Sequence, residues 1–404
     1  MKAHYRNLLI AGVILLLIGF VWYRDNLRGI WPAILPAQTS TVTPSALLSP
    51  GATPVGSGNT TGLALTIPPG FSISTFAKNL PGARVIVQDT FGNLWVSQPS
   101  EGVVTQIELD DSGRVVRQNV VFKNLRKPHG LAFDPAAPTM LYIAEENKIS
   151  RIPTYSDGSL EKIADLPAGG NHTSRTLGFG PDGRLYVSIG STCNVCNEQN
   201  NMRAKIFSMK KDGSDLKEYA RGLRNAVFFT WHPNTKQMWA TEMGRDLLGD
   251  NTPPDEVNII QAGKNYGWPI CYGKNTHDTQ FDKNTYIRNP CEEPTEIPSY
   301  IDLQAHSAPL GLAFVTSSKW PAEYRNNLIV AFHGSWNRTQ PTGYKLVRFK
   351  LDNQGRVQGA QEDFISGWLR GNTASGRPVD VVMAGDTLYI SDDKAGVIYK
   401  ITPP

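Results

Sequence analysis

Several elements that often identify an enzyme are missing from these 404 residues. The sequence contains no P-loop, no glycine-rich dinucleotide fingerprint, no HExxH zinc motif and no GxSxG nucleophile elbow. It also lacks a cluster of lysine and arginine, and its net charge of +4 is small for the length. These absences argue against nucleotide-binding, HExxH-protease and serine-hydrolase chemistry, and they exclude a nucleic-acid partner.

Cysteine is scarce, with only four residues that form two pairs close in sequence: Cys193 with Cys196, and Cys271 with Cys291. Two disulfides would place the protein in an oxidising compartment. The alternative is a structural zinc site, which commonly uses two CxxC pairs, whereas only one CxxC is present here. We therefore expect the disulfides Cys193–Cys196 and Cys271–Cys291.

Long hydrophobic runs are also rare, and one lies at the N-terminus, from Leu8 to Tyr23. It is shorter than an ideal membrane span of ~20 residues. It is long for the core of a signal peptide, and no A-x-A cleavage site follows it. We expect residues 1–35 to form an uncleaved membrane anchor, with the catalytic domain outside the cytoplasm. A cleaved signal segment and a secreted protein are the alternative.

Residues 36–62 consist mainly of Ser, Thr, Pro, Gly and Ala and contain no charged residue. Such a segment cannot bury a core, so we expect a disordered linker. The folded domain is expected over residues 63–404.

The body repeats one short strand signature: an apolar residue, an aromatic or apolar residue, an apolar residue and a small residue. The copies are Leu94–Ser97, Leu141–Ala144, Leu185–Ser188, Met238–Thr241, Leu328–Ala331 and Leu388–Ser391. Most copies are about 45 to 60 residues apart, a period typical of propeller blades. Six copies predict an all-β, six-bladed β-propeller, with an array of β-sandwiches as the alternative. The longer gap near residues 245–300 is interpreted as an insertion loop that carries Cys271 and Cys291.

Equivalent residues of the blades should meet around the propeller axis, and the residues that precede each innermost strand should surround one mouth of the channel. Four of these six positions carry arginine: Arg84, Arg175, Arg224 and Arg377. His129, His172 and His306 lie close by in the sequence. Gathered arginines repel one another and favour an anionic ligand such as a carboxylate or phosphate. The alternative is that each arginine pairs with an acidic residue of a neighbouring blade.

Two further segments carry candidate chemistry. His172 lies in the polar segment 169–175, where it could act as a general base near neutral pH or simply be a hydrogen-bonded loop histidine. Residues 242–246 and 250–256 are rich in oxygen ligands, which suit calcium, although acidic loops are usually only solvated.

Taken together, these segments resemble the soluble quinoprotein sugar dehydrogenases that depend on pyrroloquinoline quinone (PQQ), with the glucose, sorbosone and aldose dehydrogenases among them. The matching motifs are 171–177, 180–183, 222–225, 265–269, 306–309, 333–338 and 376–378. The resemblance extends from about Leu65 to the C-terminus.

The resemblance implies oxidation of the C1 hydroxyl of an aldose to a lactone, or of a related sugar aldehyde, by hydride transfer to PQQ. His172 would be the base that removes the hydroxyl proton, and Arg224 would stabilise charge on the quinone oxygen. Arg224, Asn225 and Arg377 would bind the cofactor, and Asn171 would bind the sugar. Some members have Asp at the position of Asn171, which affects the expected substrate orientation.

The resemblance also implies two calcium sites. The backbone carbonyls of Gly244 and Arg245 would bind the Ca²⁺ that bridges the cofactor. Glu256 and the carbonyl of Tyr266 would bind a second, structural Ca²⁺. The expected partners are a sugar, an electron acceptor of unknown identity and, through the N-terminal segment, a membrane. A calcium-dependent propeller lactonase and a non-catalytic binding propeller are the alternative functions.

Overall fold

The computed structural model describes residues 58–155 and 158–404. The predicted anchor, residues 1–35, lies outside the described residues, as does most of the predicted linker. Within the described ranges no helix is long and apolar enough to cross a membrane. The anchor therefore stays a prediction.

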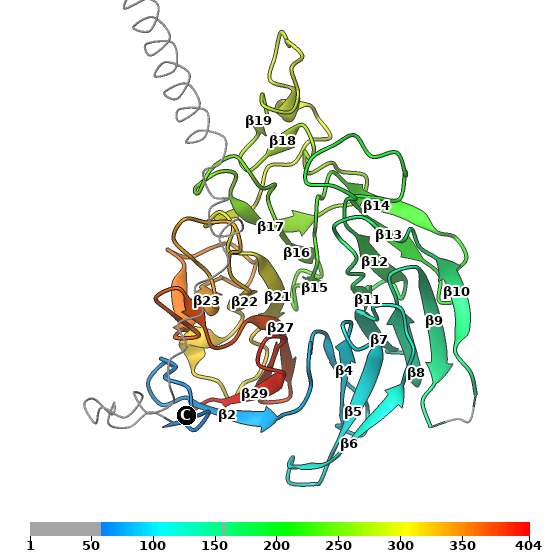
Figure 1. The fold of residues 1–404 in the computed structure, drawn as a ribbon, viewed down its shortest axis with the longest axis vertical. Coiled ribbons are helices and arrows are strands. Elements are labelled where there is room, and N and C mark those ends of the chain that lie inside the picture. The colour runs from blue at the N-terminus through cyan, green and yellow to red at the C-terminus, as the bar shows by residue number, and fades with distance from the viewer. Residues whose placement is uncertain (1–57, 156–157) are drawn as a thin grey trace, which may run out of the picture.

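Six sheets surround a central axis and form a six-bladed β-propeller, so the predicted all-β fold is confirmed (Figure 1). From the axis outward, the first three blades contain β3 (Ile86–Gln88), β4 (Leu94–Gln98), β5 (Val103–Leu109) and β6 (Val115–Phe122); β7 (Gly130–Asp134), β8 (Ala137–Ala144), β9 (Lys148–Pro153) and β10 (Glu161–Asp165); and β11 (Leu177–Phe179), β12 (Leu185–Ile189), β13 (Lys205–Met209) and β14 (Lys217–Arg221). The next two contain β15 (Phe229–Trp231), β16 (Met238–Glu242), β17 (Asp255–Ile260) and β20 (Ile301–Leu303); and β21 (Pro309–Phe314), β22 (Leu328–Phe332), β23 (Lys345–Phe349) and β24 (Glu362–Ile365).

The sixth blade joins the two ends of the described chain. It contains β27 (Pro378–Ala384), β28 (Thr387–Asp392) and β29 (Val397–Thr402), followed by β2 (Ser72–Ala77) and β1 (Gly58–Asn59). Strand β2 pairs antiparallel with β29, with Ile73 opposite Ile401, and β1 pairs parallel with β2. Gly58 and Asn59 thus belong to the sheet although they lie inside the segment expected to be linker, and Asn59 Nδ2 donates to the carbonyls of Leu63 and Leu65.

The repeated sequence signature lies in the second strand of every blade: β4, β8, β12, β16, β22 and β28. All five residues are buried in β4, β12, β16 and β22. A second strand is paired on both edges and covered on both faces by the neighbouring blades. The sequence of a second strand therefore contains consecutive apolar residues, as is typical of strands that are buried on both faces. Large side chains fill the space between blades, and Trp95, Trp239, Trp320 and Trp368 are fully buried.

The insertion in the fourth blade is shorter than predicted. Strand β17 occupies part of the expected loop, so the insertion runs from residue 261 to 300 and carries β18 (Cys271–Tyr272), β19 (Thr276–His277) and the 3-10 helix η2 (Pro290–Glu292). Elsewhere there are the 3-10 helix η3 (Ala322–Tyr324) and the hairpin β25 (Leu369–Arg370) with β26 (Thr373–Ala374). Cys271–Cys291 and Cys193–Cys196 are both disulfides, which confirms the predicted pairing over the zinc alternative.

Candidate active site at the channel mouth

The candidate site forms where the innermost strands begin and the second strands end. These two strands are antiparallel in each blade, so the start of one lies beside the end of the other. The face therefore collects two sets of loops from each blade. It lies at the opposite end of the inner strands from an apolar opening of about 540 Å³ that contains none of the predicted site residues.

A cavity of about 200 Å³ lies at this face. It is lined by His172, Arg224, Asn225, Met243, Gly244, Asp246, Asp255, His306, Ala308, Trp336 and Asn337. A second hollow of about 300 Å³ is lined in part by Arg84, Lys127, His129, Thr173, Ser174 and Asp393. Thr173 and Ser174 directly follow His172 in the sequence, so the two hollows share one loop.

His172 is held in one orientation by Ser191. Its Nδ1 lies 2.9 Å from both the Ser191 carbonyl oxygen and Oγ. The hydroxyl itself donates to the Cys193 carbonyl, 2.7 Å away. Both Ser191 oxygens therefore act as acceptors, which places the ring proton on Nδ1 and leaves the Nε2 lone pair available.

The electrostatic environment keeps His172 neutral. Burial, followed by the positive charge of Arg224, lowers its pKa to about 3. A neutral imidazole with a free Nε2 can accept a proton from a bound hydroxyl group. The side chain can therefore serve as a general base.

Arg224 is fixed by four hydrogen bonds and is only 5% exposed. Its Nη2 lies 2.9 Å from Asp246 Oδ2, and its Nη1 donates to the Met243 carbonyl. Its Nε and Nη2 donate to the carbonyl and side-chain oxygens of Asn194. The guanidinium group thus occupies one position beside the cavity before any ligand binds.

The four arginines predicted to surround the channel mouth are not all left for an anionic ligand. Arg84 pairs with Asp393 at 2.9 Å, and Arg224 pairs with Asp246. Arg175 is fully buried and donates to the carbonyls of Pro167, His172 and Ser174, so it shapes the His172 loop. The alternative of ion pairing with a neighbouring blade holds for Arg84, whereas Arg224 and Asp246 both belong to the fourth blade.

Arg377 differs from these arginines. It donates to the carbonyl oxygens of His333 and Gly334 and stacks over the ring of Tyr344. Within the described residues no carboxylate forms an ion pair with Arg377. His333 lies beside it and bonds Asp393 through Nε2, and burial lowers the pKa of His333 to about 4. Arg377 is thus without a direct ion pair in the described structure, and it interacts electrostatically with the nearby Asp393.

The predicted cofactor residue Asn225 lies in the cavity. Its backbone N–H donates to Glu242 Oε1 at 2.9 Å, and its amide contacts Met243 Sδ at 3.4 Å. Asn171, the predicted sugar-binding residue, is exposed beside His172 and is not among the described residues that line the cavity. The structure thus brings His172, Arg224 and Asn225 together and leaves Asn171 at the edge.

The predicted metal ligands gather around a small, partly open cavity of about 20 Å³ next to the site. Gly244, Arg245, Glu256 and Tyr266 all line it, together with Glu242. The volume suffices for one ion or water molecule. Burial raises the pKa of Glu256 to about 6 and that of Glu242 well above its ordinary value. Glu242 Oε2 is buried without a hydrogen-bond partner in the described structure, so this oxygen is free to coordinate a cation.

Several site residues escaped prediction from the sequence. Asp246 accepts hydrogen bonds from both Arg224 and Asn337, the latter at 2.6 Å. Gly190 leaves the space for His172, because a Cβ there would lie 2.6 Å from the His172 Cβ. Trp336 lines the cavity although 54% of it is exposed. Of these residues, Trp336 had a signal in the sequence, because the tripeptide Ser335-Trp336-Asn337 lies inside the matching motif 333–338.

Comparison of the sequence with known proteins identifies a family and several relatives. The TrAA12-like family matches residues 65–403. An uncharacterized protein of Borreliella burgdorferi is 32% identical over 83% of this chain and 90% of its own length. The pyrroloquinoline quinone-dependent pyranose dehydrogenase of Coprinopsis cinerea is 26% identical over 82% of this chain, which spans about half of that protein (54%).

Solved structures confirm the fold. The calcium structure of the Trichoderma reesei carbohydrate-active enzyme of family AA12 has a TM-score of 0.72 and 21% identity, over 86% of this chain and all of that one (100%). The resemblance to PQQ-dependent sugar dehydrogenases, stated from the sequence, is confirmed at the level of the family. The chain belongs to the TrAA12-like family, whose relatives include PQQ-dependent sugar dehydrogenases.

Proposed function

We propose that this chain is a PQQ-dependent dehydrogenase that oxidises the C1 hydroxyl of an aldose to a lactone, or a related sugar aldehyde, with calcium as a second cofactor. The observation that carries the proposal is the geometry of His172. Its Nδ1 proton is committed to Ser191, and its neutral Nε2 is left to face a cavity that also contains Arg224.

The residues around the cavity suit a tricarboxylate such as PQQ. Arg377 forms no ion pair within the described chain. Lys127 and Arg84 line the neighbouring hollow, where Lys127 also pairs with Glu146 and Arg84 with Asp393. Arginine binds carboxylates bidentately, and the buried, neutral His129 and His333 add no repelling charge. We assign Arg224, Asn225 and Arg377 to cofactor binding. PQQ, when bound, supplies the two-electron acceptor for the sugar.

The small cavity beside the site suits calcium. Ca²⁺ prefers carboxylate and carbonyl oxygens, and Glu242 offers an unpartnered buried oxygen. The sequence predicted two calcium sites, one at the backbone carbonyls of Gly244 and Arg245 and one at Glu256 and the carbonyl of Tyr266. All four residues line the same space, so this proposal assigns these oxygens to one site. A cation there would also offset the unfavourable burial of the two carboxyl groups.

Each side chain of the site has a defined task. His172 Nε2 accepts the proton of the C1 hydroxyl as the hydride leaves C1. Arg224 contributes a fixed positive field where negative charge develops, and it needs no reorganisation because four hydrogen bonds already hold it. Trp336 presents an exposed aromatic face at the cavity, on which the apolar face of a sugar ring can pack.

The two disulfides favour an oxidising compartment, so we infer that the propeller works outside the cytoplasm. This inference concerns the described domain. The predicted N-terminal membrane attachment is a separate proposal.

Reconstitution tests the function. Purified protein is incubated with PQQ and CaCl₂, and reduction of an artificial dye is followed with a panel of aldoses and sugar aldehydes. We expect turnover only when both cofactors are present. Lactone hydrolysis without PQQ would support the lactonase alternative, and saturable PQQ binding without turnover on any sugar would support a binding propeller.

A further inference from the structure

The loop between β12 and β13 contacts both principal residues of the proposed site. We call residues 191–198 the disulfide loop, because Cys193 and Cys196 are bonded within it. At its start, Ser191 holds His172, and the backbone N–H of Ser191 donates to the Arg224 carbonyl at 2.7 Å. The loop therefore lies directly behind the cavity.

Asn194, between the two cysteines, is the center of these contacts. Its carbonyl oxygen accepts from Arg224 Nε at 2.9 Å, and its Oδ1 accepts from Arg224 Nη2 at 3.0 Å. The same Oδ1 accepts from the Asp246 backbone N–H at 2.7 Å, and its Nδ2 donates to the Asp246 carbonyl. Asn194 thus positions both members of the Arg224–Asp246 ion pair.

Asn194 also contacts the insertion of the fourth blade. The indole Nε1 of Trp268 donates to the Asn194 carbonyl at 3.3 Å. This contact offers a spectroscopic report on the loop, because an indole N–H resonance depends on its acceptor.

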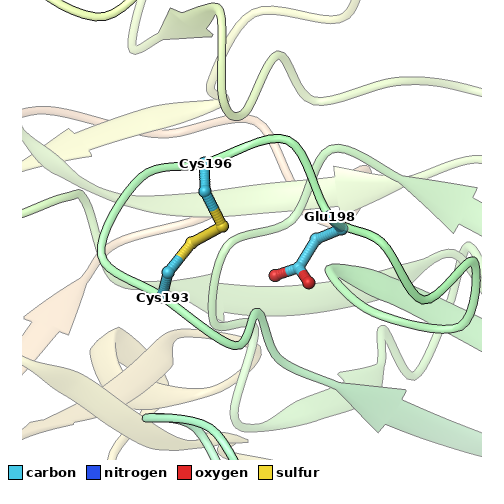
Figure 2. Close-up of side chains that lie close together, drawn as sticks. All are labelled: Cys193, Cys196 and Glu198. Atoms are coloured by element: carbon cyan, nitrogen blue, oxygen red, sulfur yellow. A yellow bond between two sulfur atoms is a disulfide. The ribbon is translucent and has the colours of Figure 1, made fainter.

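Two links close the disulfide loop. One is the Cys193–Cys196 bond, and the other is Glu198, whose carboxylate accepts from the Thr192 backbone N–H at 2.6 Å and from its hydroxyl at 2.8 Å. Figure 2 shows the disulfide and the Glu198 carboxylate within the same loop. If the disulfide opens, Glu198 still holds the base of the loop while Asn194 loses its covalent constraint.

The two disulfides differ in their access to solvent. Cys271 and Cys291 are 8% and 1% exposed, whereas Cys193 and Cys196 are both only partly buried. A reductant dissolved in water therefore reaches the bond in the disulfide loop more readily.

We propose that the Cys193–Cys196 disulfide is a redox switch that controls the position of Arg224 through Asn194. The proposal rests on the proposed function, because it assigns Arg224 to the cofactor site. A dithiol reductant donates two electrons and two protons, the S–S bond breaks, and Cys193 and Cys196 become thiols. The reductant is oxidised to its own disulfide, and reoxidation of the two cysteines reverses the step.

The oxidised loop holds Asn194 with two acceptors aimed at Arg224. The reduced loop lets Asn194 move, so Arg224 loses both acceptors and keeps the Asp246 and Met243 contacts. Hydrogen bonds to a charged group contribute more than neutral ones, so losing both should weaken binding of an anion at Arg224 by about tenfold or more.

The experiment compares oxidised protein, protein reduced with dithiothreitol, and three variants: Cys193→Ser/Cys196→Ser, Asn194→Ala and Asn197→Ala. Asn197→Ala is the matched control, since it makes the same change at an exposed position one residue beyond the disulfide. Mass spectrometry after alkylation identifies which cysteines are reduced. EDTA is present during these steps, because the freed thiols and Glu198 lie close enough to bind a metal ion.

Two readouts are needed. The first is the PQQ dissociation constant, from absorbance titration with calcium restored. The second is the indole N–H resonance of Trp268 in ¹⁵N-tryptophan-labelled protein, assigned with Trp268→Phe, which requires no cofactor. Circular dichroism confirms that each variant is folded.

We expect Cys193 and Cys196 to be alkylated first, with a shifted Trp268 resonance and PQQ binding weakened about tenfold or more. The double serine variant should behave likewise. Asn194→Ala removes only the side-chain acceptor and keeps the backbone carbonyl that Arg224 Nε and Trp268 contact, so it should weaken PQQ binding to a smaller extent and leave the Trp268 resonance nearly unchanged. Asn197→Ala should match the wild type. An unmoved Trp268 resonance after reduction of this bond would overturn the proposal, as would earlier reduction of Cys271–Cys291. If even the oxidised protein fails to bind PQQ, the proposed function fails, while the Trp268 readout still decides whether the disulfide controls the loop.

Discussion

At the scale of single residues, His172 shows how burial can make a side chain neutral that would otherwise ionise near neutral pH. Burial and the nearby Arg224 hold its pKa at about 3, against an ordinary value of about 6.5. Ser191 accepts the one remaining ring proton. What His172 offers a substrate is therefore a lone pair rather than a charge, which is the form that a general base requires.

The first prediction concerns this residue. His172→Ala should lower kcat by about 100- to 10,000-fold, the usual contribution of a positioned acid or base. PQQ affinity should change little, because the arginines that we assign to the cofactor remain. Dye-linked turnover at saturating PQQ and a separate PQQ titration measure the two effects. Unchanged turnover would remove His172 from the mechanism.

The second prediction concerns Arg377, which has no ion-pair partner within the described chain. Arg377→Ala should weaken PQQ binding by about tenfold or more, because a charge-assisted hydrogen bond to a carboxylate is lost. The effect should appear in the dissociation constant rather than in kcat at saturating cofactor. Arg370→Ala, an exposed change in the β25–β26 hairpin, serves as the control. Equal affinities for the two variants would contradict the assignment of Arg377.

At the scale of the elements, what could be predicted follows from burial. The second strands are largely buried and begin or centre on apolar residues, and their repeat was sufficient to predict six blades. The outer strands carry weaker signals: β6 and β10 have no fully buried residue. β17 was mistaken for loop because its first two residues, Asp255 and Glu256, are acidic yet buried.

The partners of the charged residues were harder to predict than the strands. Arg84 and Asp393 form an ion pair although 309 residues separate them. Their contact depends on how the first and sixth blades meet, which no local pattern encodes. Asn194 likewise acquires its role from Arg224 and Asp246 in the next blade, 30 and 52 residues away. The sequence could predict the channel mouth and His172, but not this network.

The third prediction concerns the strand that closes the propeller. Ile73 in β2 is fully buried, and its neighbours in the core include residues of the fifth and sixth blades. Ile73→Ala should lower the free energy of unfolding by about 2 to 4 kcal/mol, through lost burial and a residual cavity. Urea unfolding followed by fluorescence and by circular dichroism measures this. The exposed Ser72→Ala in the same strand should be nearly neutral. Local fraying of β2 without a shift of the main transition would contradict a closing role.

At the scale of the whole molecule, buried carboxyl groups and buried histidines have opposite effects on how stability changes with pH. Burial raises the pKa of Asp255 and Asp380 to about 7, whereas an aspartate in the unfolded chain has a pKa of about 3.9. Between these values the folded protein retains protons that the unfolded chain releases, so stability falls as the pH rises. His172 and His333, with pKa values lowered to about 3 and about 4, act in the opposite sense and lose stability as the pH falls below about 6.5.

The two effects offset each other in mild acid, and above about pH 6.5 only the carboxyl groups continue to act. The loss of stability that the buried carboxyl groups cause above this pH should be smaller where a cation binds to them. Glu242 and Glu256 face the small cavity and must lose their protons to bind calcium, so calcium binding should release protons and strengthen as the pH rises. Asp380 lies across the channel, bonded to the backbone N–H groups of Ile86 and Val381, outside that cavity.

The fourth prediction follows because Glu242 and Glu256 line the small cavity whereas Asp380 does not. CaCl₂ should raise Tm more at pH 8 than at pH 5, because a ligand that binds the folded state more tightly stabilises it more. Glu242→Gln should abolish the calcium-dependent rise by removing the unpartnered carboxylate oxygen. Asp380→Asn should keep that rise and reduce only the loss of stability between pH 6 and pH 8 measured in EDTA. Thermal unfolding of the wild type and both variants, with Mg²⁺ as the control ion, supplies the test. A calcium shift of equal size at both pH values, or one that survives in Glu242→Gln, would show that the ion binds elsewhere in the propeller.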